Sequence, residues 1–544
     1  MQISGVPSRK QNLLLKSGLK GVAAVTIAAG LNNVGGKALA GDASTNSITS
    51  DPVLNLMLEK GMITEDEAAK VQGQVDSMRT NPVAIMPPSK WNISAGIKNI
   101  ELFGDLRLRY EDRQETAAGG GTIDLQRFRY AVRFGLRGEA FDDLYFGLRV
   151  DTSQNPRSPF VTFSQSTGVA STPFGKSSSG LNVAQAYLGW RPSSWLDLTV
   201  GAMPNPLYTT PMIWSSYLNP VGLAEKFKYT VGQADFFATF GQFIYADQNP
   251  VDASGGLGFN GLNGQFAKNI YQLAWQGGVN YHITTNLSAK MGATIYQYYG
   301  LQQSTADNNT SPFYGDPYVG EGSYLGPGTG TVNGFSGFGS SSTQPGFMSL
   351  GYPNNQVGLN HLLVLEVPWE INYKFKWFDT RLFGDFAYNF QGRERAEDAA
   401  AGYKEFLTVA GAPPSFQPFS PQTDQNKAYQ IGFAIGSHDT LGLVNGTTTR
   451  KNSWEVRTYW QHVEQYAVDP NLVDLDFFAG ALNMEGVYAA AAYGLTDNSI
   501  LTVRYGHATR IDDKLGTGGT GTDIPQINPI KNYNLFQADL TFRF

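Results

Sequence analysis

Cysteine is absent from all 544 positions, which excludes disulfide bridges and thiolate metal sites. Charged residues make up only 16% of the chain, the formal net charge is -6 and no basic run occurs, so nothing predicts a nucleic-acid partner. No HExxH, GxSxG or Walker pattern is present, and the five histidines are scattered without metal-ligand spacing: His282, His361, His438, His462 and His507. We therefore expect no metal, no cofactor and no catalytic residues.

Long apolar runs are also lacking, because no stretch reaches the ~20 residues of a membrane-spanning helix. In residues 1–40, four basic residues (Arg9, Lys10, Lys16 and Lys20) precede a mildly apolar stretch, and the segment ends on Ala38-Leu39-Ala40. This order is typical of a secretory signal peptide with cleavage after Ala40. A membrane anchor is the alternative, although its apolar stretch would be short. The mature chain is expected to leave the cytoplasm.

Residues 41–90 predict a periplasmic helical segment followed by a proline-rich linker. Apolar residues at helical spacing within 51–80 indicate two short amphipathic helices, and Thr64 with Glu67 predicts a capping box for the second. Such short helices are unstable alone, so they need a partner. Copies of themselves in a coiled coil and a loosely ordered appendage both remain open.

From about residue 100 onward, apolar and polar residues alternate with a period of two. In "QRFRYAVRFGLRG", Phe128, Tyr130 and Val132 alternate with arginines and an alanine. Such strands run for ten or more residues, whereas soluble strands typically run ~5–6. About sixteen of them, joined by alternating short turns and long loops, predict that residues 91–544 form an all-β, transmembrane antiparallel β-barrel. The long connection 437–452 breaks this alternation.

The chain ends on "NLFQADLTFRF", where the alternation continues to the last residue. Every backbone N–H and C=O in lipid must be paired, so the last strand is expected to pair with the first. A terminal strand with Phe542 and Phe544 resembles the outer-membrane assembly signal of bacterial barrels. The resemblance implies recognition by the barrel-assembly machinery and a place among the lipids of the bacterial outer membrane.

The segments "AQAYLGW" and "GAMPNPLY…W…LNPVGLA" resemble the bacterial putative porin family, and the resemblance covers about Asp51 to Phe544. It implies a water-filled channel for passive diffusion of small hydrophilic solutes or ions, without catalytic residues. A non-conducting structural or adhesive barrel and a barrel-embedded hydrolase are alternatives. A TonB-dependent transporter is disfavoured because no plug-sized domain precedes the first strand. Barrels of this size are commonly trimers, which suggests self-association by analogy alone.

Two sites are predicted in the pore. The loop after the fifth strand, "PNPLYTTPMIWSSYLNPV", is expected to fold inward as a constriction. Its candidate residues are Pro206, Tyr208, Trp214 and Tyr217. An external loop packed on its neighbours is the alternative.

The second predicted site is a basic wall on the inward face of the first three strands. It consists of Arg107, Arg109, Arg127, Arg129, Arg133, Arg137 and Arg149. Asp105, Asp143 and Asp151 partly offset its charge. Free arginines would favour anions, whereas arginines paired with carboxylates would give a transverse field with almost no selectivity. Both interpretations stay open.

Overall fold

The computed structural model divides the chain into two units, Met1–Pro87 and Pro88–Phe544. It describes residues 60, 64, 66, 67 and 70 of the first unit, and in the second 96–117, 121–163 without 142 and 154, 180–246, 270–299, 331–332, 335–336, 361–400 without 398, 420–517 and 530–544. The predicted signal peptide, the linker and most of the predicted helical segment lie outside the described residues.

The capping box of the first unit is present as predicted. The Thr64 N–H donates to Glu67 Oε2 at 2.9 Å, and the Glu67 N–H donates to Thr64 Oγ1 at 3.4 Å. Residues 66, 67 and 70 are helical. These two hydrogen bonds are the reciprocal contacts of a capping box.

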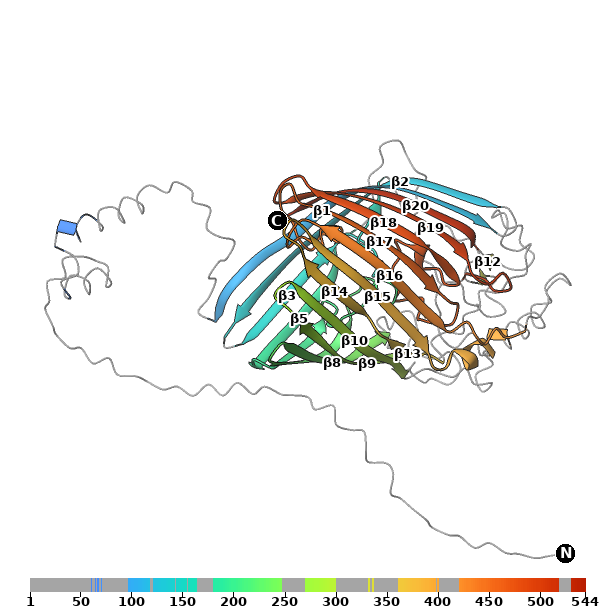
Figure 1. Cartoon of the computed structure of the whole chain (residues 1–544), viewed down its shortest axis with the longest axis horizontal. Helices are drawn as coiled ribbons and strands as arrows, with labels where there is room; N and C mark the ends of the chain where they lie inside the picture. Colours follow the sequence, from blue (N-terminus) through green and yellow to red (C-terminus); the bar gives the residue numbers. More distant parts are fainter. Residues whose placement is uncertain are drawn as a thin grey trace, which may run out of the picture. The chain divides into compact units, whose positions relative to one another are not determined.

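Strands form most of the described second unit (Figure 1). They are β1 (Ile97–Ala117), β2 (Thr122–Ala140), β3 (Leu144–Asp151), β4 (Val161–Thr162), β5 (Asn182–Ser193), β6 (Leu196–Ala202), β7 (Val221–Val231), β8 (Ala234–Ala246), β9 (Ile270–His282), β10 (Leu287–Tyr299), β11 (Thr331–Val332), β12 (Phe335–Ser336), β13 (Leu363–Glu366), β14 (Trp369–Lys374), β15 (Asp379–Asn389), β16 (Lys427–Gly436), β17 (Trp454–Val463), β18 (Met484–Gly494), β19 (Ser499–Arg510) and β20 (Ile530–Arg543).

The helical parts of this unit are short. Residues 392–397 and 399–400 are helical, and η2 (Phe478–Gly480) is a 3-10 turn. Among the described residues, no helix is long and apolar enough to cross a membrane.

The strands close into a barrel because β1 pairs with both β2 and β20, antiparallel in each case. Two irregularities interrupt barrel strands: β4 continues the pairing of β3 with β2, and β13 and β14 pair in turn with β10 and β15. Counted this way, the barrel has sixteen strands, as predicted. Gly104 exchanges two backbone hydrogen bonds with Phe544, at 3.0 and 3.1 Å, so the expected pairing of the chain end with the first strand is confirmed.

The alternating pattern of the strands sorts side chains between the two faces of the barrel. On β9, Gln272 and Gln276 are buried inside while Trp275 is exposed outside. Leu106 and Leu108 are likewise exposed outside, and Arg107 and Arg109 between them are buried. A period of two places one parity on each face of a sheet, so the inward polar parity is confirmed.

Short turns and the chain end share one end of the barrel, which we call the short-turn end. The Arg543 N–H donates to the carbonyl of Asn498 in one of these turns. The irregular connection 437–453 also lies here and packs into the barrel: its Leu443 is fully buried, and the N–H of Val444 donates to Glu455 Oε2 at 2.9 Å. Its length is thus explained by a luminal position.

Candidate functional site: the barrel lumen

The predicted constriction loop, residues 203–220, lies inside the barrel. Its neck is closed by a hydrogen bond from the Met203 N–H to the carbonyl of Pro220 at 2.9 Å. Further along, Tyr208 exchanges two hydrogen bonds with the inward side chain of Gln276 on β9, at 2.8 and 2.7 Å. The amide of Gln276 therefore holds the loop backbone against the inner wall.

Two threonines fasten the same loop to the inner wall at β13 and β15. Thr209 Oγ1 donates to Glu366 at 2.5 Å, and Thr210 Oγ1 donates to Asp385 at 2.5 Å. The Tyr296 hydroxyl donates to the other oxygen of Glu366 at 2.5 Å. Since the loop leaves from β6 and reaches β9, β13 and β15, it spans the lumen.

The two remaining aromatic candidates of the loop are also inside. Trp214 is 4% exposed and packs against Phe243, with ring centroids 6.1 Å apart. The Tyr217 hydroxyl accepts a hydrogen bond from Arg107 Nη1 at 3.3 Å, and the Arg133 guanidinium lies over the Tyr217 ring. The structure thus places the loop within the barrel rather than outside it, while its effect on conductance stays a prediction.

A second luminal segment, residues 464–483, joins β17 to β18. Nearly all of its residues are buried. Its Leu472 carbonyl accepts a hydrogen bond from the Ser215 N–H at 2.6 Å, and its Asp474 N–H donates to the Pro211 carbonyl at 3.1 Å. The two luminal segments therefore contact each other directly, an arrangement that the sequence analysis did not predict.

Apolar side chains hold these two segments together. The cluster includes Met212 and Trp214 from one segment and Phe477, Phe478 and Leu482 from the other. The strands line the interior with polar side chains, as predicted, but the loops fill part of that interior with apolar ones. The free cross-section is therefore narrower than the strand count alone suggests.

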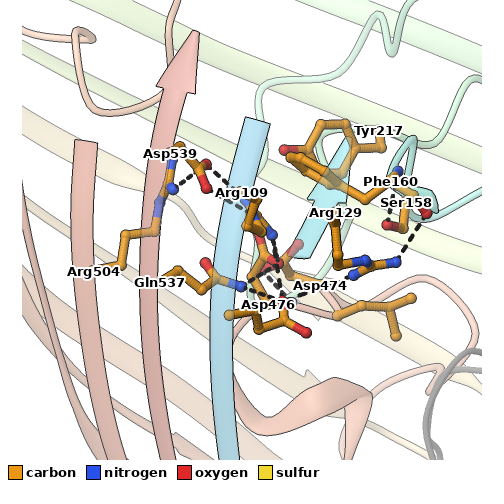
Figure 2. A network of polar contacts seen from close by, with 12 residues as sticks. Arg109, Arg129, Ser158, Phe160, Tyr217, Asp474, Asp476, Arg504, Gln537 and Asp539 are labelled. Carbon is orange, nitrogen blue, oxygen red and sulfur yellow. Dashed lines mark hydrogen bonds and ion pairs between the residues drawn. The ribbon is translucent and has the colours of Figure 1, made fainter. Parts of the chain in front are cut away.

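Ion pairs fasten the second segment to the wall (Figure 2). Arg109, which is 1% exposed, donates from Nη1 to Asp476 at 2.6 Å and from Nε to Asp539 on β20 at 2.7 Å. Arg504 on β19 approaches Asp539 at 2.5 Å. The Arg109 guanidinium also stacks on Phe160, 3.8 Å from the ring centroid. Arg109 thus links the loop carboxylate of Asp476 to the wall carboxylate of Asp539, which Arg504 also contacts.

Each arginine of the predicted basic wall points inward and has a carboxylate within ion-pair distance. The pairs are Arg107–Asp105 at 3.0 Å, Arg109–Asp476 at 2.6 Å, Arg127–Glu111 at 2.6 Å, Arg129–Glu111 at 3.7 Å, Arg133–Asp105 at 2.5 Å, Arg137–Glu101 at 2.9 Å and Arg149–Asp151 at 2.9 Å. Asp143, expected to offset the wall, lies in the turn before β3 and forms no ion pair with these arginines among the described residues. The geometry favours the paired interpretation of the wall.

Glu111 is the centre of this network. It is completely buried, and its carboxylate accepts from Arg113 Nε at 3.1 Å and from Gln537 Nε2 at 2.9 Å, besides its contacts with three wall arginines. A buried carboxylate among several guanidiniums is held in place by charge-assisted hydrogen bonds. Removing it would leave several cations without compensation.

The carboxyl groups of Asp474 and Asp476 behave differently although they lie two residues apart. Burial raises the pKa of the Asp474 carboxyl to about 7, and the charge of Asp476 acts in the same direction. Burial opposes ionisation of Asp476 too, but Arg109, Arg504 and Arg113 hold its pKa well below the usual range. Asp474 is therefore a group of this segment that titrates near neutral pH.

This difference predicts a pH dependence of stability. The pKa of Asp474 is higher in the folded state than the ~3.9 of an unfolded aspartate, so the folded state binds the extra proton between these values. Stability should fall as the pH rises from ~4 to about 7. Asp474→Asn should reduce the difference in urea unfolding midpoint between a buffer near pH 5 and one near pH 8. Asp513→Asn, at an exposed loop position, is the matched control. A wild-type difference retained in Asp474→Asn would contradict this prediction.

A cavity of about 850 Å³ lies at the short-turn end, beside the constriction loop. Its walls come from the turns around 143 and 193–197 and from the adjoining ends of β7, β8, β9 and β10. Pro206, Leu207 and Tyr208 of the constriction loop also line it. Pro206 and Tyr208 are thus predicted site residues that the structure places where a solute could reach them.

Comparison with known proteins gives one family and several distant structural likenesses. Residues 118–544 match a family described as Putative porin. The chain is similar to the outer membrane channel DcaP of Acinetobacter baumannii, with 11% identity, 84% of this chain and 100% of that chain covered, and a TM-score of 0.38. It is also similar to a mutant of the Rh. blastica porin (10% identity, 82% and 100% covered, TM-score 0.33) and to OmpT of Vibrio cholerae (10%, 84% and 100%, TM-score 0.35). At these scores the likenesses carry no conclusion on function, and no curated protein matches the chain.

Proposed function

We propose a function from one premise: this chain belongs to the Putative porin family, whose members' shared sequence pattern extends over residues 118–544. Its location is the bacterial outer membrane. The protein forms a channel through which small hydrophilic solutes or ions diffuse passively. The observation that carries this proposal is a closed sixteen-strand barrel with polar side chains on its inner face and apolar ones outside.

The outer face supports a membrane-spanning position. Large apolar side chains are exposed on it, among them Phe128, Leu188, Val200 and Met291. Contiguous apolar surface of this kind is costly in water and stable in lipid. The short-turn end would face the periplasm, as in bacterial outer-membrane barrels. Phe542 and Phe544 would serve the barrel-assembly machinery as a terminal signal, and both side chains are exposed on the outside.

Two further parts of the proposal concern the N-terminal residues and the assembly. Residues 1–40 would be removed as a signal peptide, and 41–90 would remain in the periplasm as a helical segment. The barrel would assemble as a homotrimer, by analogy with barrels of this size. Light scattering of the detergent-solubilised protein is expected to give the mass of three chains, and a monomer would contradict the trimer.

A swelling assay tests the channel itself. Liposomes that contain the folded protein are expected to swell in small sugars at rates that fall as the sugar becomes larger, because the luminal segments limit the cross-section. Protein-free liposomes and liposomes with heat-unfolded protein are the controls. Equal swelling in all three preparations would favour the non-conducting structural or adhesive barrel instead.

A barrel-embedded hydrolase remains the enzymatic alternative. The described residues contain no group of His, Cys, Asp and Glu side chains suited to a metal ion. Ester hydrolysis by the folded protein that disappears only when the protein is unfolded would support that alternative.

Mild anion preference is the last part of the proposal. The arginine wall is not its source, because each of its arginines is paired with a carboxylate. Inward cations outside that wall are the better candidates.

A further inference from the structure

The cavity at the short-turn end is lined by four basic residues, Arg191, Lys226, Lys228 and Lys290. Arg191 and Lys226 both contact the carboxylate of Asp197, at 3.5 and 3.2 Å, so their charges are compensated. Lys228 is exposed near the end of β7. Lys290 on β10 is different, because aromatic rings enclose it. Within the described part of the chain, its ammonium group has neither an ion pair nor a hydrogen bond with a protein acceptor. Its charge is therefore available to a ligand.

The position of Lys290 is set by aromatic rings. Its Nζ lies 3.7 Å from the centroid of the Tyr208 ring and 5.4 Å from that of Phe237. The two rings meet edge to face, with centroids 6.2 Å apart. A cation over an aromatic face is held electrostatically without using its N–H donors. Those donors can still serve a solute in the cavity.

The acidic residue beside Lys290 contacts other side chains instead. Glu370 lies opposite Lys290 in the pairing of β10 with β14. Its carboxylate contacts Arg381 at 3.5 Å and accepts from Asn372 Nδ2 at 3.2 Å. Glu370 therefore contributes to the field around Lys290 without a direct ion pair.

We propose that Lys290 and Tyr208 form a binding site for the carboxylate or phosphate group of a passing solute. The ammonium supplies charge and donors, the phenol ring keeps it in place, and Phe237 offers an apolar face to the rest of the solute. Because Tyr208 belongs to the constriction loop and is fixed by Gln276, the site lies where the cavity meets that loop. This inference rests on the proposed channel function and names its specificity-determining residue.

The test uses the full-length folded protein in planar bilayers, after wild-type conductance has been established. Chloride current is measured while inorganic phosphate or acetate is added to each chamber in turn. Lys290→Gln should raise the concentration that halves the current about tenfold for the anion that binds, because a charge-assisted hydrogen bond is lost. It should also move the reversal potential in a salt gradient toward cations. Lys290→Arg should keep most of both effects.

Lys374→Gln is the matched control, because Lys374 also lies at the short-turn end but is exposed and paired with Asp439 at 2.6 Å. It should behave as the wild type. If Lys290→Gln weakens block by phosphate but not by acetate, the site is a phosphate site. If it weakens block by both anions, the site is a general oxyanion site. Unchanged block and reversal potential in a conducting Lys290→Gln barrel would overturn the inference. A wild-type barrel without conductance would instead overturn the proposed function.

Discussion

Deletion of residues 207–217 is expected to raise single-channel conductance by a factor of about two or more, because conductance follows the open cross-section of the pore. These residues carry the contacts with Gln276, Glu366 and Asp385 by which the constriction loop spans the lumen. The neck hydrogen bond between Met203 and Pro220 lies outside the deletion, so the ends of the loop stay close together.

A milder variant tests the effect of the loop's position on conductance without changing the loop's length. The double variant Thr209→Val, Thr210→Val keeps the length of the loop but removes the hydroxyl contacts with Glu366 and Asp385. It should increase current fluctuations more than mean conductance. Heat-modifiable mobility on gels shows whether each variant folds. Wild-type conductance in a folded deletion variant would mean that the loop does not limit the pore.

The Glu111→Gln substitution is expected to have the largest effect on stability. It removes the carboxylate shared by Arg109, Arg113, Arg127 and Arg129 and leaves buried guanidiniums without compensation. Breaking a buried ion pair by removing one partner typically costs about 3–5 kcal/mol. The measurement is the urea midpoint of unfolding in lipid vesicles.

Glu101→Gln provides the control for that measurement. Its partner Arg137 has a side chain that is 55% exposed, and an exposed ion pair contributes about 0–1 kcal/mol. Similar midpoints for Glu111→Gln and Glu101→Gln would show that the network around Glu111 does not stabilise the barrel.

The barrel itself was predictable because its cause is local and repeated. Each strand alternates apolar and polar residues, and this alternation alone predicts that Arg107 and the other wall arginines face inward. Closure through the terminal strand followed from the need to pair backbone groups in lipid. Both features depend on period and not on distant contacts.

The contents of the lumen were predicted only in part. The proline-rich composition of 203–220 marked one inward loop, but 464–483 was missed although its stretch "VDLDFFAGALN" combines apolar residues with acids outside the period-two pattern. The sequence also could not show which side chains form ion pairs. Arg109 pairs with Asp476 and Asp539, which lie 367 and 430 positions away. Periodicity gives the face of a side chain, whereas its partner depends on how loops fold across the barrel.

For the same reason, the sequence did not show that the wall arginines are paired with carboxylates. Counting inward cations on three strands suggested a basic wall, but Glu111 lies on the same inward parity of β1 and Asp476 comes from the second luminal segment. Charge in a lumen is set by the sum over wall and loops. Lys290, which lines the described cavity without such a partner, could be recognised only from coordinates.

The central claim is that this barrel conducts, and single-channel recording of the purified full-length protein in planar bilayers tests it most directly. Discrete current steps of uniform size are predicted at low voltage, with a conductance below that of the 207–217 deletion variant. Silent bilayers, obtained with protein whose folded state is verified by heat-modifiable mobility, would contradict the account.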